Sequence, residues 1–476
     1  MPPTDAMPDA MPDPNADLLE ARAGDALTLP DAEARAAWSA TVRAFLAHGT
    51  QTPERLADTL ERAPDFAMGH AAHGLFCLLL ARRELVAVAE EDWRRAEAAR
   101  HAAGAHPCEA AVVDALRDWL DGAPSRAAAR LDATLADHPR DAFLMKLVHA
   151  IRFVLGDAAG MRASIETVRG AYDADHPALG FLLGCHAFAL EETGAYDAAE
   201  RIGRRAVELC PDDAWGLHAV AHVYDMTGRA EAGRVWLEGN TAAFAHCNNF
   251  RFHVWWHLAL MYLDKGDTDR VIALYDEEIR RERTDDYRDI SNAASLLMRL
   301  EIEGVNVGGR WEELARLAET RIDDRCNVFA DLHSMLSLGG GGRRAEADAL
   351  ISSIALHAEE ASDMGRVAAE AGVPAASGLD AYFRGNYFSA FHHLNRARPR
   401  LASVGGSHAQ RDVFERLAID AALRAGLAGE AERLIRERLA LRGALDRFAC
   451  ERLEKVESLK RAAHIMQDEG LRAVPV

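Results

Sequence analysis

The stretch GFLLGCHAFALEETGAYDAAERIGRRAVELCPDD, residues 180–213, decides the fold. Its first half is apolar almost throughout and stops at Gly194, and its second half places small residues at helical spacing before a proline. A glycine between two helical segments favours a tight turn, and a proline ends the second helix. The stretch therefore predicts two antiparallel helices, marked in order by Gly194, Tyr196, Ala199, Ala206 and Pro211.

The same turn recurs along the chain. Pro139 follows Gly122 at the same interval at which Pro211 follows Gly194. A period of about 34 residues with these marks is typical of tetratricopeptide repeats. Turn glycines recur at or slightly above this period at Gly122, Gly156, Gly194, Gly228 and Gly266. In the C-terminal part the period is looser, and we expect turns near Gly309, Gly342, Gly385 and Gly426.

The repeats predict an all-α, tetratricopeptide-like α-solenoid of roughly ten helix pairs. The first pair is expected to begin near Ala34 and to close at Pro64, and a final helix is expected around residues 452–467. Each pair has an apolar face that only a neighbouring pair can cover, so the pairs must stack into a superhelix. We expect one solenoid over residues 18–470, with an acidic, proline-rich disordered tail at residues 1–17 and a short tail at residues 471–476.

The amino-acid composition limits the classes of binding partner and the cellular compartment that we expect for this protein. The 476 residues carry a net charge of −20, which argues against nucleic acid and against an anionic membrane surface as partners. The longest apolar stretch, residues 75–81, is too short to span a bilayer. Seven scattered cysteines without a CxxC motif favour a reducing compartment, and the first residues lack the basic and apolar regions of a signal peptide. We expect a cytoplasmic protein, and homo-oligomer formation stays open.

Histidines are the most informative polar residues. His218 and His222 lie four residues apart on one predicted first helix, and His253 and His257 repeat that spacing on the next. Residues four apart share one face of a helix. Two such pairs on neighbouring stacked helices are therefore expected to bring four imidazoles together on the concave side of the middle repeats.

Three interpretations of these four histidines remain open. They could be core or surface residues that hydrogen-bond to neighbours. They could form a cradle for a polar or anionic group. They could instead form a metal or acid–base site, because His-x3-His on a helix is a common way to bind zinc or iron. Nearby carboxylates could complete or orient such a site, namely Asp225, Asp289 and Asp331.

Six strings, in this order along the chain, resemble the tetratricopeptide repeat protein 38 family. They are HAVAHVYDM (residues 218–226), HVWWHLALMYLDKGD (253–267), LYDEEI (274–279), RDISNAASLLMRLEIEGVNVGGRW (288–311), FADLH (329–333) and GGSHAQRDVF (405–414). The resemblance runs from about residue 180 to AAHIMQ at residues 462–467 and is weaker in the N-terminal third. It implies an α-superhelix whose function is poorly defined.

The resemblance also implies a set of polar site residues. These residues would meet in one concavity only if the C-terminal part of the superhelix curls back toward the middle. His408 stands where the family also accepts Asn. The residues implied to bind a ligand are His218, His222, Asp225, His253, His257, Asp289, Asp331, His333, Gln410, Arg411 and Asp412.

Two functions follow as hypotheses. The first is a cytoplasmic binding protein whose concave pocket, lined by His, Asp and Arg, takes a small polar or anionic ligand or a partner segment. The alternative is a hydrolase or a lyase-like enzyme that uses the same cluster for metal-dependent or general acid–base catalysis. The catalytic candidates are then His222, His257, Asp331 and His333. The cofactor is undetermined, and the candidate ligands of a divalent metal are His218, His222, His253 and His257.

Overall fold

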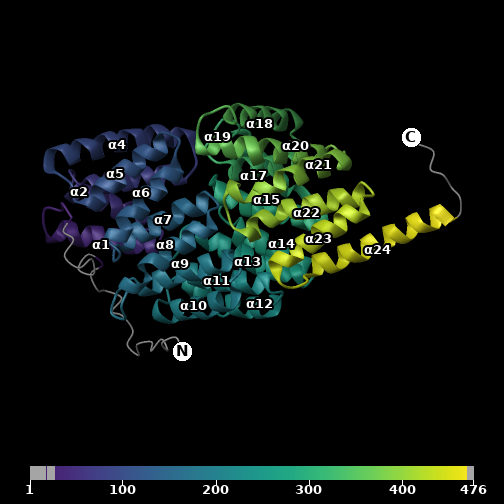
Figure 1. Cartoon of the computed structure of the whole chain (residues 1–476), viewed down its shortest axis with the longest axis horizontal. Coiled ribbons are helices and arrows are strands. Elements are labelled where there is room, and N and C mark those ends of the chain that lie inside the picture. The colour runs from purple at the N-terminus through teal and green to yellow at the C-terminus, as the bar shows by residue number, and fades with distance from the viewer. Residues whose placement is uncertain (1–17, 19–26, 469–476) are drawn as a thin grey trace.

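The computed structural model describes Leu18 and residues 27–468, and within this part every regular element is helical (Figure 1). The only strand-like feature among these residues is an isolated antiparallel bridge between Gly49 and Cys247. The predicted all-α class is therefore confirmed. The tails expected at residues 1–17 and 471–476 lie outside the described residues.

The described helices form eleven antiparallel pairs and a last single helix, against the roughly ten pairs expected. The first helices of the pairs are α1 (Ala32–Leu46), α3 (Ala67–Leu79), α5 (Pro107–Leu120), α7 (Ala142–Val154), α9 (Leu179–Glu192), α11 (Ala214–Met226), α13 (Phe250–Asp264), α15 (Tyr287–Ile302), α17 (Val328–Gly340), α19 (Asp363–Val367) continued by α20 (Val373–Phe383), and α22 (His408–Arg424). The second helices are α2 (Thr52–Arg62), α4 (Arg83–Ala103), α6 (Pro124–Asp137), α8 (Ala158–Val168), α10 (Tyr196–Leu209), α12 (Ala230–Glu238), α14 (Thr268–Leu274), α16 (Trp311–Glu319), α18 (Arg344–His357), α21 (Tyr387–Ala397) and α23 (Ala428–Arg442). The last helix, α24 (Arg447–Asp468), begins slightly earlier than expected.

Glycines in the left-handed region make the turns within the pairs. All five glycines of the central repeats have φ between 65° and 81°, a conformation that costs glycine nothing and other residues about 1–2 kcal/mol. Gly342, Gly385 and Gly426 also have positive φ, as expected. The turn expected near Gly309 is wrong, because α15 already ends at Ile302 and Gly304 takes the left-handed conformation with φ 82°. Gly309 lies instead in the short 3-10 turn that leads into α16.

First and second helices differ in how they are buried. In α9 every residue from Leu179 to Glu191 is buried, whereas α10 buries only one stripe, at Ala199, Gly203, Ala206 and Leu209. A helix that is apolar on all sides must be covered on all sides, and one with a single apolar stripe can face water. The first helices therefore form an inner layer and the second helices an outer one. No described helix is long and apolar enough to cross a membrane.

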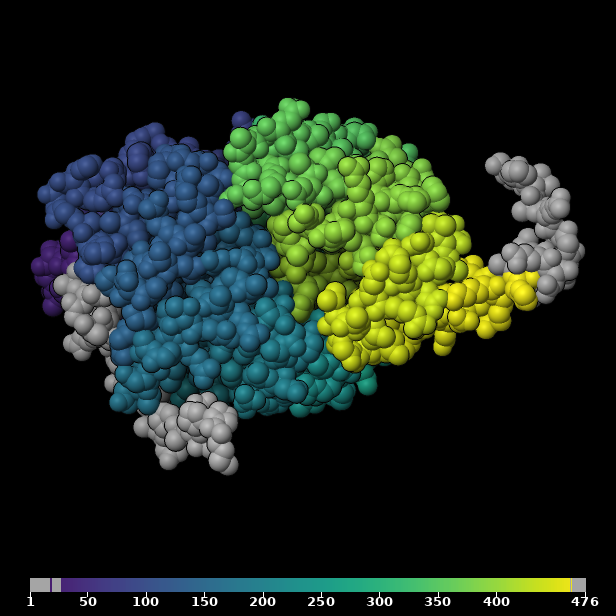
Figure 2. Space-filling view, in the orientation of Figure 1, coloured from purple at the N-terminus to yellow at the C-terminus, as the bar shows by residue number. Residues whose placement is uncertain are grey.

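The superhelix closes on itself. The turn between α5 and α6 touches the start of α19, where the Asp363 amide donates to the Gly122 carbonyl at 2.8 Å. Arg321, after α16, donates to Glu84 at the start of α4 at 2.8 Å. Inner helix α22 contacts both α11 and α15, so the C-terminal part does curl back. Figures 1 and 2 show the early, blue pairs lying directly against the late, green pairs.

The closure gives two glycines very different surroundings. A methyl group on Gly156 would lie 1.9 Å from the carbonyl oxygen of Ala402 in the C-terminal part, whereas one on Gly194 would meet nothing within 4 Å. Both glycines have positive φ.

We predict that Gly194→Ala lowers the free energy of unfolding by about 1–2 kcal/mol, the cost of the backbone conformation alone. Gly156→Ala should cost a further ~1–3 kcal/mol from the steric clash, as measured by chemical denaturation. Equal losses would contradict the contact between the two parts.

Candidate metal centre

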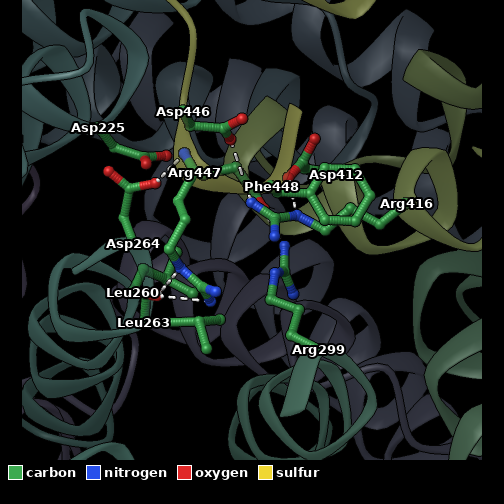
Figure 3. A pocket seen from close by; sticks show the side chains of 11 residues that line it. Asp225, Leu260, Leu263, Asp264, Arg299, Asp412, Arg416, Asp446, Arg447 and Phe448 are labelled. Carbon is green, nitrogen blue, oxygen red and sulfur yellow. Dashed lines mark hydrogen bonds and ion pairs between the residues drawn. The ribbon is translucent and has the colours of Figure 1, made fainter. Parts of the chain in front are cut away.

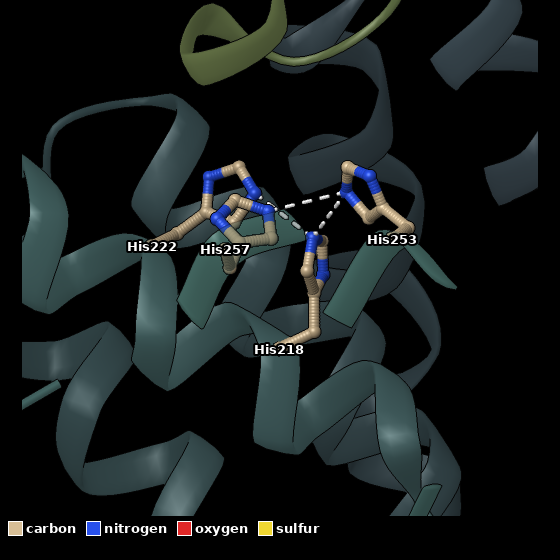
Figure 4. A group of neighbouring side chains, drawn as sticks. All are labelled: His218, His222, His253 and His257. Atoms are coloured by element: carbon tan, nitrogen blue, oxygen red, sulfur yellow. Dashed lines mark hydrogen bonds between the residues drawn. The ribbon is translucent and has the colours of Figure 1, made fainter. Parts of the chain in front are cut away.

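Four histidines from two neighbouring inner helices point their rings at one spot (Figure 4). His218 and His222 come from α11, and His253 and His257 from α13. Nε2 of His218 lies 2.9 Å from Nε2 of His222 and 3.0 Å from that of His253. Nε2 of His257 lies 3.2 Å from Nε2 of His253. The predicted meeting of the four imidazoles is what the structure has.

Hydrogen bonds cannot account for all three of these contacts. A neutral imidazole nitrogen carries either one hydrogen or one lone pair in the ring plane. Each Nε2 can therefore take part in one good hydrogen bond, and at most two of the three contacts can be hydrogen bonds at once. The Nδ1 atoms of His218 and His257 are also buried without a hydrogen-bond partner. As a purely hydrogen-bonded group, the cluster would be costly.

The opposite ring nitrogen of His253 favours a lone pair on its Nε2. Nδ1 of His253 lies 2.9 Å from Oδ1 of Asn292, an acceptor, so this nitrogen carries the hydrogen and Nε2 carries the lone pair. Nδ1 of His222 lies 3.3 Å from a carboxylate oxygen of Glu191, on α9. Histidines that bind metals usually donate from their other nitrogen to a carboxylate or carbonyl, which sets the tautomer. Nδ1 of His253 has such a partner, whereas Nδ1 of His222 forms no hydrogen bond with Glu191.

Burial favours neutral rings at His218, His253 and His257. His218, His222 and His257 are at most 1% exposed, and His253 is half-buried. Burial holds the pKa of His218 and His257 well below the ordinary value and lowers the pKa of His253 to about 3. Neutral imidazole is the form that binds a metal ion, whereas a cradle for anions would need imidazolium. The charge state therefore favours the metal interpretation over the anion cradle.

The spacing of the nitrogens suits one ion. Zinc–nitrogen bonds of about 2.0–2.1 Å place tetrahedral ligands about 3.3–3.4 Å apart, and a square-planar site with similar bonds would place neighbours about 2.8–3.0 Å apart. The observed distances of 2.9 and 3.0 Å match the square-planar range, and that of 3.2 Å lies just below the tetrahedral range. The ring centroids are only 4.3–4.8 Å apart, so an organic ligand has no room between them.

The remaining predicted site residues do not join the histidines. Asp225 pairs with Arg442 at 2.9 Å, and Asp412 pairs with Arg416 at 2.7 Å and with Arg438 at 2.5 Å. Both aspartates line a cavity of about 10 Å³, the room of one water molecule (Figure 3). The Asp225–Arg442 pair ties α23 to α11 in the middle of the chain, whereas Asp412 pairs within the C-terminal helices α22 and α23.

The other five residues lie in separate surroundings. Asp289 accepts hydrogen bonds from Asn249 and Thr284, and burial raises its pKa to about 7. Asp331 lines a different cavity of about 20 Å³, and burial raises its pKa to about 8. Each of the remaining three has a local partner: His333 donates to the carbonyl of Phe329, Gln410 completes the N-terminal capping box of α22, and Arg411 donates to the carbonyls of Gly405 and Gly406. The expectation of one shared pocket for all eleven residues is therefore wrong.

Sequence reasoning missed the carboxylates beside the centre. Glu191 and Glu192 end α9, an otherwise apolar inner helix, and the side chain of Glu191 is fully buried. His408, where the resembling family also accepts Asn, places Nε2 2.6 Å from Oε1 of Glu191. The available signal was the pair of acids in the last turn of an apolar helix, because the end of an inner helix still faces the interior.

Comparison with known proteins shows a distant structural likeness. No family model matches the chain. The crystal structure of the APC/C hetero-tetramer Cut9–Hcn1 is similar to this chain with a TM-score of 0.43 and 14% identity, over 89% of this chain and 76% of that chain. The assignment of a tetratricopeptide-like solenoid rests on the helix pairs and their glycine turns, which this chain shows directly.

The buried ion pairs around Asp412 make stability depend on pH. Burial alone would raise the pKa of Asp412, but Arg438 and Arg416 outweigh it and hold the pKa well below the ordinary value. The ionised carboxylate therefore stabilises the fold above the unfolded-state pKa of about 4, and this stabilisation is lost as pH falls below it.

We predict that Asp412→Asn lowers the free energy of unfolding by about 3–5 kcal/mol at pH 7, and that the difference in this free energy between variant and wild type narrows below pH 4.

Asp348 supplies the control for this measurement. Its side chain is 62% exposed and pairs with Arg384 on the surface. Exposed pairs contribute about 0–1 kcal/mol, so Asp348→Asn should change the unfolding curves little at any pH. If Asp412→Asn lowers the free energy of unfolding by the same amount at every pH down to 3, the lowered pKa of Asp412 is refuted.

Proposed function

We propose that this protein is a helical-repeat protein that holds a divalent transition-metal ion through Nε2 of His218, His222, His253 and His257. One observation carries the proposal: four imidazoles in the inner layer bring neighbouring Nε2 atoms to 2.9–3.2 Å, in contacts that hydrogen bonds cannot all satisfy. A shared cation satisfies all four lone pairs at once. Imidazole ligands suit zinc, copper, iron and nickel, and four nitrogens in a closed site suit zinc well.

The ion would fasten two neighbouring repeats together. It would bind α11 and α13 at the centre of the inner layer. Closed four-ligand sites contribute directly to folding, because the ligands are not assembled in the unfolded chain. A closed site of four histidines therefore favours a metal-stabilised scaffold over a pocket for a small polar ligand. The enzyme hypothesis would need a coordination position open to substrate, and three of the four rings are at most 1% exposed.

The proposal also covers the cellular compartment, the kind of binding partner and the family of this protein. None of the seven cysteines, all among the described residues, forms a disulfide, in keeping with a reducing compartment such as the cytoplasm. Stacked helix pairs commonly bind other proteins, so a protein partner on the outer surface is part of this proposal. Membership in the tetratricopeptide repeat protein 38 family is also proposed, on the six strings alone.

Metal analysis tests the proposal. We predict that purified protein loaded with zinc and desalted retains zinc, and that His218→Ala lowers the zinc content by one ion per chain. Zinc at about 100 times its dissociation constant should stabilise wild type by about 2.7 kcal/mol. The zinc-dependent rise in melting temperature should be greatly reduced in His218→Ala, because the variant keeps only three of the four nitrogens.

A second buried histidine serves as the matched control. His333 is 1% exposed and lies outside the cluster, with Nδ1 bonded to a carbonyl. His333→Gln should lower stability and leave the zinc content unchanged. A wild-type protein that retains no zinc, copper, nickel or iron would refute the proposed function.

A further inference from the structure

A second group of ligand atoms adjoins the first and shares His222 with it. Its members are the carboxylates of Glu191 and Glu192, the ring of His408, and the Nδ1 atom of His222. One ligand atom from each lies within 4.8 Å of the others. His222 thus faces two sets of ligands, with Nε2 turned to the three other histidines and Nδ1 turned to the carboxylates.

The contact between His222 and Glu191 is unusual. Nδ1 and Oε2 are 3.3 Å apart, both are buried, and neither has a hydrogen-bond partner. A buried ring nitrogen this close to a buried carboxylate oxygen would normally align into a hydrogen bond. Two ligands of one ion, each about 2.0–2.2 Å from it, lie about 3.3–3.5 Å apart without such alignment. The separation therefore fits two ligands of a shared ion better than it fits a donor and its acceptor.

His408 and Glu192 are the other candidate ligands of this group. His408 Nε2 lies 2.6 Å from Glu191 Oε1 and 3.5 Å from Glu192 Oε1. The side chains of Glu191 and Glu192 are 0% and 3% exposed, so two carboxylates are held out of water at one place. Buried carboxylates need cations beside them, and here the nearest are His408 and Arg411, whose Nη2 lies 3.5 Å from Glu192.

We propose that a second divalent metal ion binds Glu191, Glu192, His408 and Nδ1 of His222, with the ring of His222 bridging the two ions. The proposal rests on the proposed function, since the first ion holds Nε2 of the same ring. On binding, the second ion would displace a hydrogen from Nδ1 of His222 and one from the imidazolium of His408, and both protons would leave to solvent. Two carboxylates and one imidazolate then offset most of the charge of the two ions.

The second site lies at the seam where the superhelix closes. Glu191 and Glu192 belong to α9, whereas His408 is the first residue of α22, in the C-terminal part of the chain. The His408 side chain is 22% exposed, so an ion can reach this site from solvent while the first site is deeply buried. The first ion would fasten neighbouring repeats, and the second would fasten the C-terminal part to the middle of the chain.

Metal counting on separate variants tests this second site. Apo protein is loaded with Zn²⁺ or Cu²⁺, desalted and measured by elemental analysis. We expect two ions per chain in wild type and one in each of His408→Ala and Glu192→Gln, with two retained in His333→Gln. The Cu²⁺ form should show coupled spins through the bridging ring, with an electron paramagnetic resonance intensity below two spins per chain. His408→Ala should show one uncoupled spin.

The possible outcomes separate the two proposals. One ion in wild type and one in both variants would overturn the second site and leave the first intact. Two ions in wild type and two in both variants would overturn it as well, because these residues would then not hold an ion. No bound metal in any form would refute the proposed function itself. Because His408→Ala and Glu192→Gln remove ligands on different helices, failure of one variant to fold leaves the other to decide.

Discussion

The rest of the structure depends on the need to cover inner helices that are apolar on every face. In α11, all residues but Asp225 are buried, so neighbouring repeats alone cannot cover the helix. Coverage has to come from elsewhere in the chain, and α22 supplies part of it across the interior. Closure of the superhelix follows from this requirement. An open solenoid made of these helices would expose its inner layer to water.

Closure then determines what the polar residues of the inner layer can do. Inside a closed superhelix a charge must be paired and a polar atom must be bonded. Arg438 and Arg442 of α23 meet this condition through Asp412 and Asp225, and the Arg442–Asp225 pair joins distant parts of the chain. The group formed by the four central histidines contains no carboxylate, and the nearby Glu191 faces Nδ1 of His222 rather than Nε2. The proposed metal ion would fit the space between their rings and accept the lone pairs they present.

The sequence predicts local structure here better than it predicts closure. Helix pairs, turn glycines and the adjacency of the two His-x3-His pairs all follow from spacing, because each depends on positions within one repeat or in the next. The sequence predicts the turn after α15 at Gly309, but the structure makes it at Gly304. Both glycines lie between α15 and α16, and the residue at which α15 ends determines which of them forms the turn. The approach of His408 to Glu191 depends on the sum of small rotations between many repeats, which no local pattern encodes.

The same reasoning explains why the other implied residues fell outside the centre. Asp289, Asp331 and Gln410 are polar residues of the inner layer, yet each is bonded locally or lines its own small cavity. A polar residue in a closed inner layer is therefore weak evidence for a shared site, since burial alone obliges it to find a partner. Convergence of like atoms that cannot satisfy one another is stronger evidence. The Nε2 atoms of the four histidines meet that criterion. Nδ1 of His222 and Oε2 of Glu191 are a second sign of a missing partner, because they lie 3.3 Å apart without forming a hydrogen bond.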